Sequence, residues 1–230
     1  MSHVFAPSAA ASVPVAGGGS FPVHRIYCVG RNYVEHAKEM GFTGREPPFF
    51  FMKPADAVLP VAEGAVGEMP YPTLTKDLHH EIELVVAIGV GGKAIAAADA
   101  MRHVWGYAVG LDMTRRDLQG EAKKLGRPWD TGKSFDLSAP IGPIRAAAEC
   151  RIDAATAISL EVNGKPRQQS TIGKLIWSVA EIIEHLSAAW ELQPGDLIFT
   201  GTPEGVAAVG RGDVLKGSVA GVGSLQIELV

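Results

Sequence analysis

The chain has 230 residues, of which 47% are hydrophobic. It can therefore bury a core of its own, and it is neither disordered nor dependent on disulfides or structural metals for folding. Its formal net charge is −4 and it carries no basic stripe, which argues against a nucleic-acid partner. Two cysteines, Cys28 and Cys150, are too few for a disulfide framework and indicate a reducing compartment.

The first twenty residues are dominated by small residues and end in a Gly-Gly-Gly-Ser run. No basic segment leads into a sustained apolar stretch, so a signal peptide is not expected. The chain also has no stretch of about 18 apolar residues, the length that a membrane span requires. We therefore predict a flexible tail over residues 1–21, a single domain over residues 22–230, no membrane partner and a cytoplasmic location.

After a predicted strand at residues 25–29, the segment from Gly30 opens a short helix over residues 33–40. His36 and Glu39 are three residues apart and share a face of that helix. A carboxylate that holds a histidine makes a general-base dyad. From these residues alone, a solvated His–Glu pair on a surface helix is the stronger interpretation.

Two lysines stand where an anionic substrate could meet them. Lys53 directly follows an apolar run at residues 48–52, and Lys133 lies in the Gly- and Asp-rich loop over residues 129–136. An ammonium group is a strong partner for a carboxylate. Most lysines in such places are solvated, so both interpretations stay open here.

The segment His79-His80-Glu81-Ile82-Glu83 begins a predicted strand over residues 82–88. Because strand side chains alternate between faces, Glu81 and Glu83 point the same way and Ile82 points toward a core. Two like charges on one face repel unless a cation lies between them, and carboxylate oxygens suit Mg²⁺, Mn²⁺ or Ca²⁺. An exposed face with two solvated glutamates is an equally good explanation of this segment alone.

Asp112 ends the predicted strand over residues 107–111 and adds a third carboxylate. A helix is expected next, over residues 114–125, with Thr114 as its N-cap. Arg116 and Gln119, together with Arg115, lie about one helical turn from Asp112 and could serve the same ligand. An aspartate in a turn or cap is common, but three carboxylates would hold Mg²⁺ with positions left for water and substrate oxygens.

Further helices are expected over residues 97–104 and 172–189, the second with a continuous apolar stripe. The turn Thr200-Gly201-Thr202-Pro203 follows a predicted strand and can present backbone N–H groups and a hydroxyl to an oxyanion. An ordinary Gly-Pro turn is the alternative. Motifs for a nucleophile elbow, a zinc protease, a phosphate loop or a dinucleotide fold are missing.

Short runs rich in Val, Ile, Leu and aromatic residues, separated by many of the 27 glycines and 15 prolines, predict a β-rich chain. The predicted strands cover residues 25–29, 48–52, 82–88, 107–111, 158–162, 196–199 and 224–230. They do not alternate with long helices, which disfavours a doubly wound parallel sheet. The sequence predicts an α+β, β-rich fold in which sheets pack or roll on each other, with a few short helices.

Taken together, these segments resemble the fumarylacetoacetate hydrolase family, and within it the small acylpyruvate and fumarylpyruvate hydrolases. The resemblance runs over about residues 22–230 in the expected order. Its motifs are Cys28-Val-Gly-Arg-Asn-Tyr33, Phe51-Met-Lys-Pro54, Asp77-Leu-His-His-Glu-Ile-Glu83, Gly106-Tyr-Ala-Val-Gly-Leu-Asp-Met-Thr-Arg-Arg-Asp117, Lys133-Ser-Phe135, Val162-Asn-Gly164 and Gly195-Asp-Leu-Ile-Phe-Thr-Gly-Thr-Pro-Glu-Gly-Val206.

The resemblance implies a mixed β-sandwich roll of the family's C-terminal-domain type, a single catalytic domain and a homodimer. It implies Mg²⁺ or Mn²⁺ on the three carboxylates and a His–Glu dyad on the short helix. It also implies a set of residues that contact the substrate. The implied residues are Glu81, Glu83 and Asp112 for the metal, His36, Glu39 and Lys133 for catalysis, and Arg116, Gln119 and Thr202 for the substrate.

The activity that these parts predict is hydrolysis of the C3–C4 bond of a 2,4-dioxo acid, with fumarylpyruvate as the preferred substrate, in aromatic (gentisate-type) catabolism. His36, held by Glu39, would deprotonate a water that attacks the C4 carbonyl. The metal and Lys133 would stabilise the pyruvate enolate that leaves. Arg31, Lys53 and Arg127 are the candidate cations for the far carboxylate of the substrate.

Other activities of the same kind of site remain open at this point. These are decarboxylation of oxaloacetate, isomerisation or hydration of a dienoic diacid, and metal binding without turnover.

Overall fold

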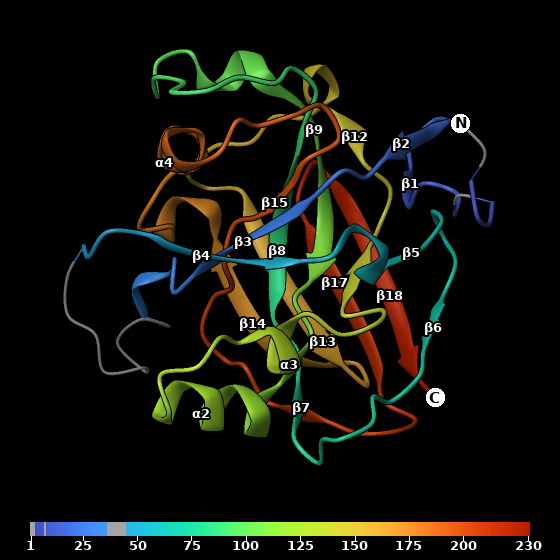
Figure 1. Ribbon diagram of the computed structural model, residues 1–230. Coiled ribbons are helices and arrows are strands. Elements are labelled where there is room, and N and C mark those ends of the chain that lie inside the picture. The colour runs from blue at the N-terminus through green and yellow to red at the C-terminus, as the bar shows by residue number, and fades with distance from the viewer. Residues whose placement is uncertain (1–2, 7, 36–44) are drawn as a thin grey trace.

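The computed structural model describes residues 3–6, 8–35 and 45–230. Within them, the largest sheet has eight strands and crosses the centre of the molecule (Figure 1). Its order is β4–β3–β15–β8–β9–β11–β5, and β12 also pairs with β9. The bounds are β4 Phe49–Lys53, β3 Ile26–Gly30, β15 Leu197–Phe199, β8 Ile82–Ile88, β9 Val104–Leu111, β11 Ala139–Ile141, β5 Val58–Pro60 and β12 Arg145–Ala146.

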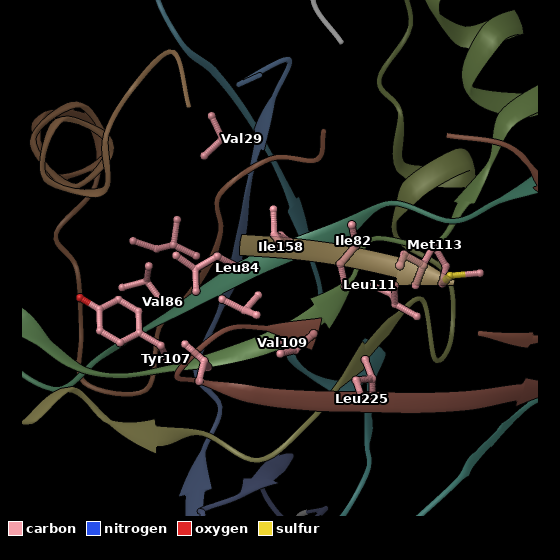
Figure 2. Packing of buried hydrophobic residues seen from close by; sticks show 14 of the residues in the cluster. Val29, Ile82, Leu84, Val86, Tyr107, Val109, Leu111, Met113, Ile158 and Leu225 are labelled. Carbon is pink, nitrogen blue, oxygen red and sulfur yellow. The ribbon is translucent and has the colours of Figure 1, made fainter. Parts of the chain in front are cut away.

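A second sheet, of five strands, packs against one face of the first. Its order is β14 Lys165–Thr171, β13 Ala157–Val162, β17 Val214–Val219, β18 Gly223–Leu229 and β6 Gly67–Met69. Figure 2 shows Ile82 and Val109 of the large sheet among the same buried side chains as Ile158 and Leu225 of the second. A Cβ atom at Gly217 would lie only 2.4 Å from the Ile82 side chain, so this glycine lets the two sheets approach each other closely.

The N-terminal residues correct one prediction. Residues 12–22 fall almost entirely in the predicted tail, yet β1 Ser12–Pro14 and β2 Ser20–Pro22 pair as an antiparallel hairpin. Val13 is fully buried and Phe21 nearly so, against the face of the large sheet that the second sheet leaves uncovered. These two apolar side chains, spaced among small residues, explain why the segment packs.

The remaining elements are short. A small sheet joins β10 Thr114–Arg115, β7 Leu78–His79 and β16 Ala208–Val209, and the α-helices are α2 Arg116–Lys124, α3 Asp130–Lys133 and α4 Val179–Ala189. Single 3₁₀ turns cover Ala55–Ala57, Ala100–His103, Ala147–Glu149 and Ile172–Lys174. In the part of the chain that the structure describes, no helix is long and apolar enough to cross a bilayer.

Every strand predicted from the sequence is present, with ends displaced by a few residues, and the β-rich α+β fold class is confirmed. The helices needed more correction. Residues 172–189 contain a helix only from Val179, because a capping box between Ser178 and Glu181 sets its start. Thr114 belongs to β10 and is not the cap of α2. Of the helix expected over residues 97–104, only a 3₁₀ turn at Ala100–His103 is present, and it runs into β9.

Candidate metal centre and substrate cleft

The register between β8 and β9 brings three acidic residues together. Ile82 lies opposite Leu111 in this antiparallel pair, and the Asp112 backbone N–H donates to the Glu81 carbonyl at 2.9 Å. Asp112 is therefore opposite Glu81 at the end of the two strands, with Glu83 two residues further along β8. Carboxylate oxygens of Glu81, Glu83 and Asp112 lie within 4.8 Å of one another.

These carboxylates are buried, which rules out the solvated strand face that the sequence left open. Glu83 is 2% exposed and Asp112 is 1% exposed. Burial raises the pKa of Glu83 well above its usual range, and the neighbouring charges of Asp112 and Glu81 raise it further. Such a cluster gains free energy when a cation binds, because the cation relieves both the repulsion and the lost solvation.

Two buried lysines partly neutralise the cluster. Lys133 Nζ lies 2.9 Å from Glu81 Oε2 and 2.6 Å from Asp112 Oδ2, and Lys53 Nζ lies 2.8 Å from Asp112 Oδ1. Burial by itself lowers the pKa of Lys133, but the Asp112 and Glu81 carboxylates outweigh it and the net shift is upward. Neither lysine is the solvated side chain that the sequence allowed.

The residues fit a divalent metal. The donors are hard carboxylate oxygens, which Mg²⁺ and Mn²⁺ prefer, and their spacing is of the order that ligands of one cation require. Within the described residues, Asp112 Oδ1 is buried and has no well-directed hydrogen bond, although Lys53 Nζ is 2.8 Å away. A buried acceptor of this kind is a natural ligand atom.

Helix α2 adds a guanidinium beside Glu81. Arg116 forms an ion pair with Glu81, and its Nη1 donates to Gln119 Oε1 at 2.6 Å. His79 Nδ1 lies 3.4 Å from Arg116 Nε, while its Nε2 contacts Asp77 Oδ1 at 2.8 Å. Because α2 begins directly after β10, which pairs with β7, the strand that leads into Glu81 also places Arg116 at the site.

The turn after β15 contacts the third carboxylate of the cluster, Glu83. The Gly201 backbone N–H donates to Glu83 Oε2 at 2.7 Å, and Thr200 is held by its hydroxyl bond to the Leu84 carbonyl at 2.8 Å. Gly201 has φ +100°, and a Cβ there would lie 2.7 Å from the Asn32 Cβ. Only glycine meets both requirements without strain. Asn32 Nδ2 donates to the Thr200 carbonyl at 2.8 Å and fixes the turn from the other side.

A cleft opens onto these groups. Arg31 lies over the Phe49 ring, 5.0 Å from its centroid, and Phe49 meets Trp129 edge to face at 5.3 Å. The cleft thus has a charged inner end and a largely aromatic outer end. It is lined by Val29, Gly30, Arg31, Phe49, Phe51, Glu81, Glu83, Asp112, Arg116, Gln119, Trp129, Lys133 and Thr202.

The structure sorts the candidate substrate residues. Arg31 lines the cleft, but Lys53 lies behind Asp112 with only 1% of its surface exposed, so it supports that carboxylate and does not face the far end of a substrate. Arg127 lines a different hollow, which Leu118 also lines. His36 and Glu39 lie outside the described residues, and the dyad stays a prediction.

Sequence reasoning assigned no role to several residues that shape the site. Asn32 stood in a noted motif, but only the fold shows that it holds the Thr200–Gly201 turn. Phe49 and Trp129 gave no signal beyond apolarity, because their meeting depends on long-range packing. Gln168 of β14 was missed for the same reason. Because strand side chains alternate between two faces, Gln168 could point either outward or inward, and only the packing of the sheets shows that it points inward.

Comparison with known proteins agrees with this geometry. The model of the fumarylacetoacetate hydrolase C-terminal domain matches residues 25–230. The chain belongs to this family. A crystal structure of fumarylpyruvate hydrolase from Pseudomonas aeruginosa, in complex with Mn²⁺ and pyruvate, is 57% identical, with a TM-score of 0.97 over 100% of this chain and 99% of that one.

Two sequence relatives carry different names. A fumarylpyruvate hydrolase of a Ralstonia species is 46% identical over 79% of this chain and 92% of its own length. The mitochondrial oxaloacetate tautomerase of Rattus norvegicus is 42% identical over 89% of this chain and 90% of its own length. Family membership therefore establishes a hydrolase or isomerase scaffold and leaves the substrate to be argued from the site.

Proposed function

We propose that the protein is a divalent-metal-dependent hydrolase that cleaves the C3–C4 bond of an acylpyruvate, with fumarylpyruvate as the preferred substrate. The observation that carries this proposal is the buried carboxylate cluster, with a lysine bonded to two of its members, at the inner end of a cleft. The relative from P. aeruginosa, with Mn²⁺ and pyruvate bound, supports it.

In this proposal Glu81, Glu83 and Asp112 hold Mg²⁺ or Mn²⁺. A bound divalent ion supplies Lewis-acid stabilisation of negative charge on substrate oxygens. The charges of the protein's own groups are already close to balance without it, because Glu81 and Asp112 form ion pairs with Lys53, Lys133 and Arg116. With a dication added, the site carries a surplus of positive charge that suits a substrate carboxylate and a developing enolate.

The remaining residues then have distinct roles. Lys133 Nζ, which donates to Glu81 and Asp112, is assigned to donate its remaining hydrogen to the enolate oxygen of the leaving pyruvate. Arg116, braced by Gln119, and Thr202 receive the substrate carboxylate. Arg31 meets the far carboxylate of the acyl group beside the aromatic rings. Water activation is assigned to His36 and Glu39, as predicted from the sequence.

A second candidate is tautomerisation of oxaloacetate, which the relatives of that name favour. This reaction moves a proton between carbon and oxygen and needs an enolate sink but no activated water. The same inner end of the cleft serves it, whereas the aromatic outer end has no partner in a substrate as short as oxaloacetate. That outer end is the reason for preferring an acylpyruvate.

The test assays purified, Mn²⁺-loaded protein against acetylpyruvate, maleylpyruvate, fumarylpyruvate and oxaloacetate. We expect pyruvate release from the acylpyruvates, fastest with fumarylpyruvate, and loss of the activity in excess chelator that Mn²⁺ restores. Enol–keto exchange of oxaloacetate is followed in parallel by absorbance. Rapid exchange without pyruvate release from any acylpyruvate would reject hydrolysis in favour of the second candidate. The homodimer and the cytoplasmic location stay predictions.

A further inference from the structure

One buried side chain joins the turn of Thr202 to the strand of the metal ligands. Gln168, on β14 of the second sheet, has no exposed surface. Its Oε1 lies 2.9 Å from His80 Nδ1 and accepts the Ile82 backbone N–H at 3.1 Å. Its Nε2 donates to Thr202 Oγ1 at 2.9 Å and to the Pro203 carbonyl at 2.8 Å.

Two backbone groups fix the orientation of this amide. The Ile82 N–H can only donate, so the atom that faces it must be the amide oxygen. The Pro203 carbonyl can only accept, so the atom that faces it must be the amide nitrogen. A flipped Gln168 would set donor against donor and acceptor against acceptor in a buried place, where unmade hydrogen bonds are costly.

The fixed amide dictates the polarity of both its side-chain partners. His80 Nδ1 must carry a hydrogen, because it faces the amide oxygen. Thr202 Oγ1 must accept, because it faces the amide nitrogen. A threonine hydroxyl has a single hydrogen, and that hydrogen is therefore left to point away from Gln168. Thr202 is 3% exposed and lines the cleft.

We propose that Gln168, held by His80, is a positioning residue that makes the Thr202 hydroxyl a hydrogen-bond donor to an anionic oxygen of the cleft ligand. Without Gln168 the hydroxyl can rotate and offer a lone pair, which a carboxylate repels. Within the described residues His80 is fully buried and its Nε2 has no partner. A buried nitrogen without a partner is unfavourable for folding. A role of His80 in holding the Gln168 amide through Nδ1 gives a reason for its presence.

The inference rests on the proposed function only in its assignment of an anionic ligand to Thr202. The experiment therefore measures binding of pyruvate to the Mn²⁺-loaded protein by calorimetry, beside the kinetic constants for an acylpyruvate. The variants are Gln168→Leu, Thr202→Val and the double variant. Titration of the metal-free proteins with Mn²⁺ alone is the control.

We expect each single variant to weaken pyruvate binding about tenfold, the loss of roughly one ordinary hydrogen bond to a charged group. KM for the acylpyruvate should rise in step, and Mn²⁺ affinity should stay within about twofold of the parent, well inside one tenfold step of affinity. The double variant should be no weaker than Thr202→Val, because Gln168 acts through that hydroxyl. Multiplying effects would show that Gln168 merely shapes the turn and would overturn the proposal, as would a large fall in Mn²⁺ affinity.

A second pair covers the case in which Gln168→Leu does not fold. His80→Asn retains a side-chain N–H near the Nδ1 position, whereas His80→Leu removes it. We expect His80→Asn to bind pyruvate nearly as the parent does and His80→Leu to bind it several-fold more weakly. Equal binding by these two variants contradicts the proposal. If the parent binds pyruvate but hydrolyses no acylpyruvate, the proposed function fails while this inference is still decided by the binding data.

Discussion

The inner and outer ends of the cleft are built in different ways. The inner end is made by Glu81, Glu83 and Asp112, at the ends of the interior strands β8 and β9, and by Lys133, the last residue of α3. Their side chains are at most 8% exposed. The outer end, made by Arg31, Phe49 and Trp129, is half-buried. Its residues come from the edge strand β4 and from loops.

This contrast separates two tasks. Strand register and buried ion pairs hold the inner groups in one arrangement, as stabilisation of developing charge requires. An edge strand and loops tolerate changes of side chain more easily, so the outer end is where the ligand that fits can vary. The following changes probe the two ends separately.

The largest effect is expected at the inner end from Glu83→Gln. The amide removes a charged ligand and disturbs the hydrogen bond from the Gly201 N–H. Turnover of an acylpyruvate should fall about 1,000-fold, corresponding to about 4 kcal/mol of transition-state stabilisation, and calorimetry should show much weaker Mn²⁺ binding. Glu161→Gln, an identical change on an exposed strand position, should alter neither. Full activity of Glu83→Gln would remove this carboxylate from the metal site.

Lys133→Met should separate catalysis from metal binding within the inner end. Methionine keeps the length of the side chain but loses the ammonium that contacts Glu81 and Asp112. Mn²⁺ affinity should be unchanged or higher, because a competing cation is gone. Turnover should fall about 100-fold, or about 2.7 kcal/mol. A parallel loss of metal binding and turnover would mean that Lys133 only supports the ligands.

At the outer end, Arg31→Met should change selectivity and leave the chemistry intact. We expect kcat/KM for fumarylpyruvate to fall about tenfold, or about 1.4 kcal/mol, while that for acetylpyruvate changes little, since acetylpyruvate has no far carboxylate. Arg127→Met, a change beside a different hollow, is the matched control. Equal losses for both substrates would contradict the assignment of Arg31 to the acyl group.

The smallest effect concerns helix α4, which lies away from both ends of the cleft in the hydrogen-bond network and reaches it through Trp177 and Asn32. Glu181 caps α4 beside Trp177, which binds Asn32, and hydrogen bonds from Ser178 and Arg45 lower its pKa to about 2. A lowered carboxyl pKa stabilises the fold above pH 4.5, and this contribution is lost as the pH falls toward 2.

Glu181→Gln should therefore lower the free energy of unfolding by less than about 1 kcal/mol at pH 7, the size of one helix cap. The difference from the parent protein should shrink between pH 4.5 and pH 3, as followed by denaturant unfolding at each pH. A difference that stays constant with pH would show that the Glu181 charge does not contribute.

The sequence by itself determined the seven predicted strands, the β-rich class and the residue types of the metal centre, whereas the other strands, among them β14 and β17, were not predicted. Strand positions follow from local apolar runs, and a pair of glutamates at strand spacing indicates a cation wherever the face is buried. The order of the short motifs along the chain was enough to show the family resemblance. It also pointed to Lys133, Arg116, Gln119 and Thr202, which the structure brings to one cleft.

Tertiary structure alone decided which charges meet. The β8–β9 register set Asp112 against Glu81, and burial sent Lys53 behind Asp112 and left Arg31 at the cleft. Packing also converted the expected N-terminal tail into a hairpin and turned Gln168 inward. Local pattern is read within a few residues, whereas the contacts of Glu81 with Asp112, Lys53 with Asp112 and Gln168 with Thr202 join segments 30 or more positions apart. Their free energy exists only once both sheets have closed.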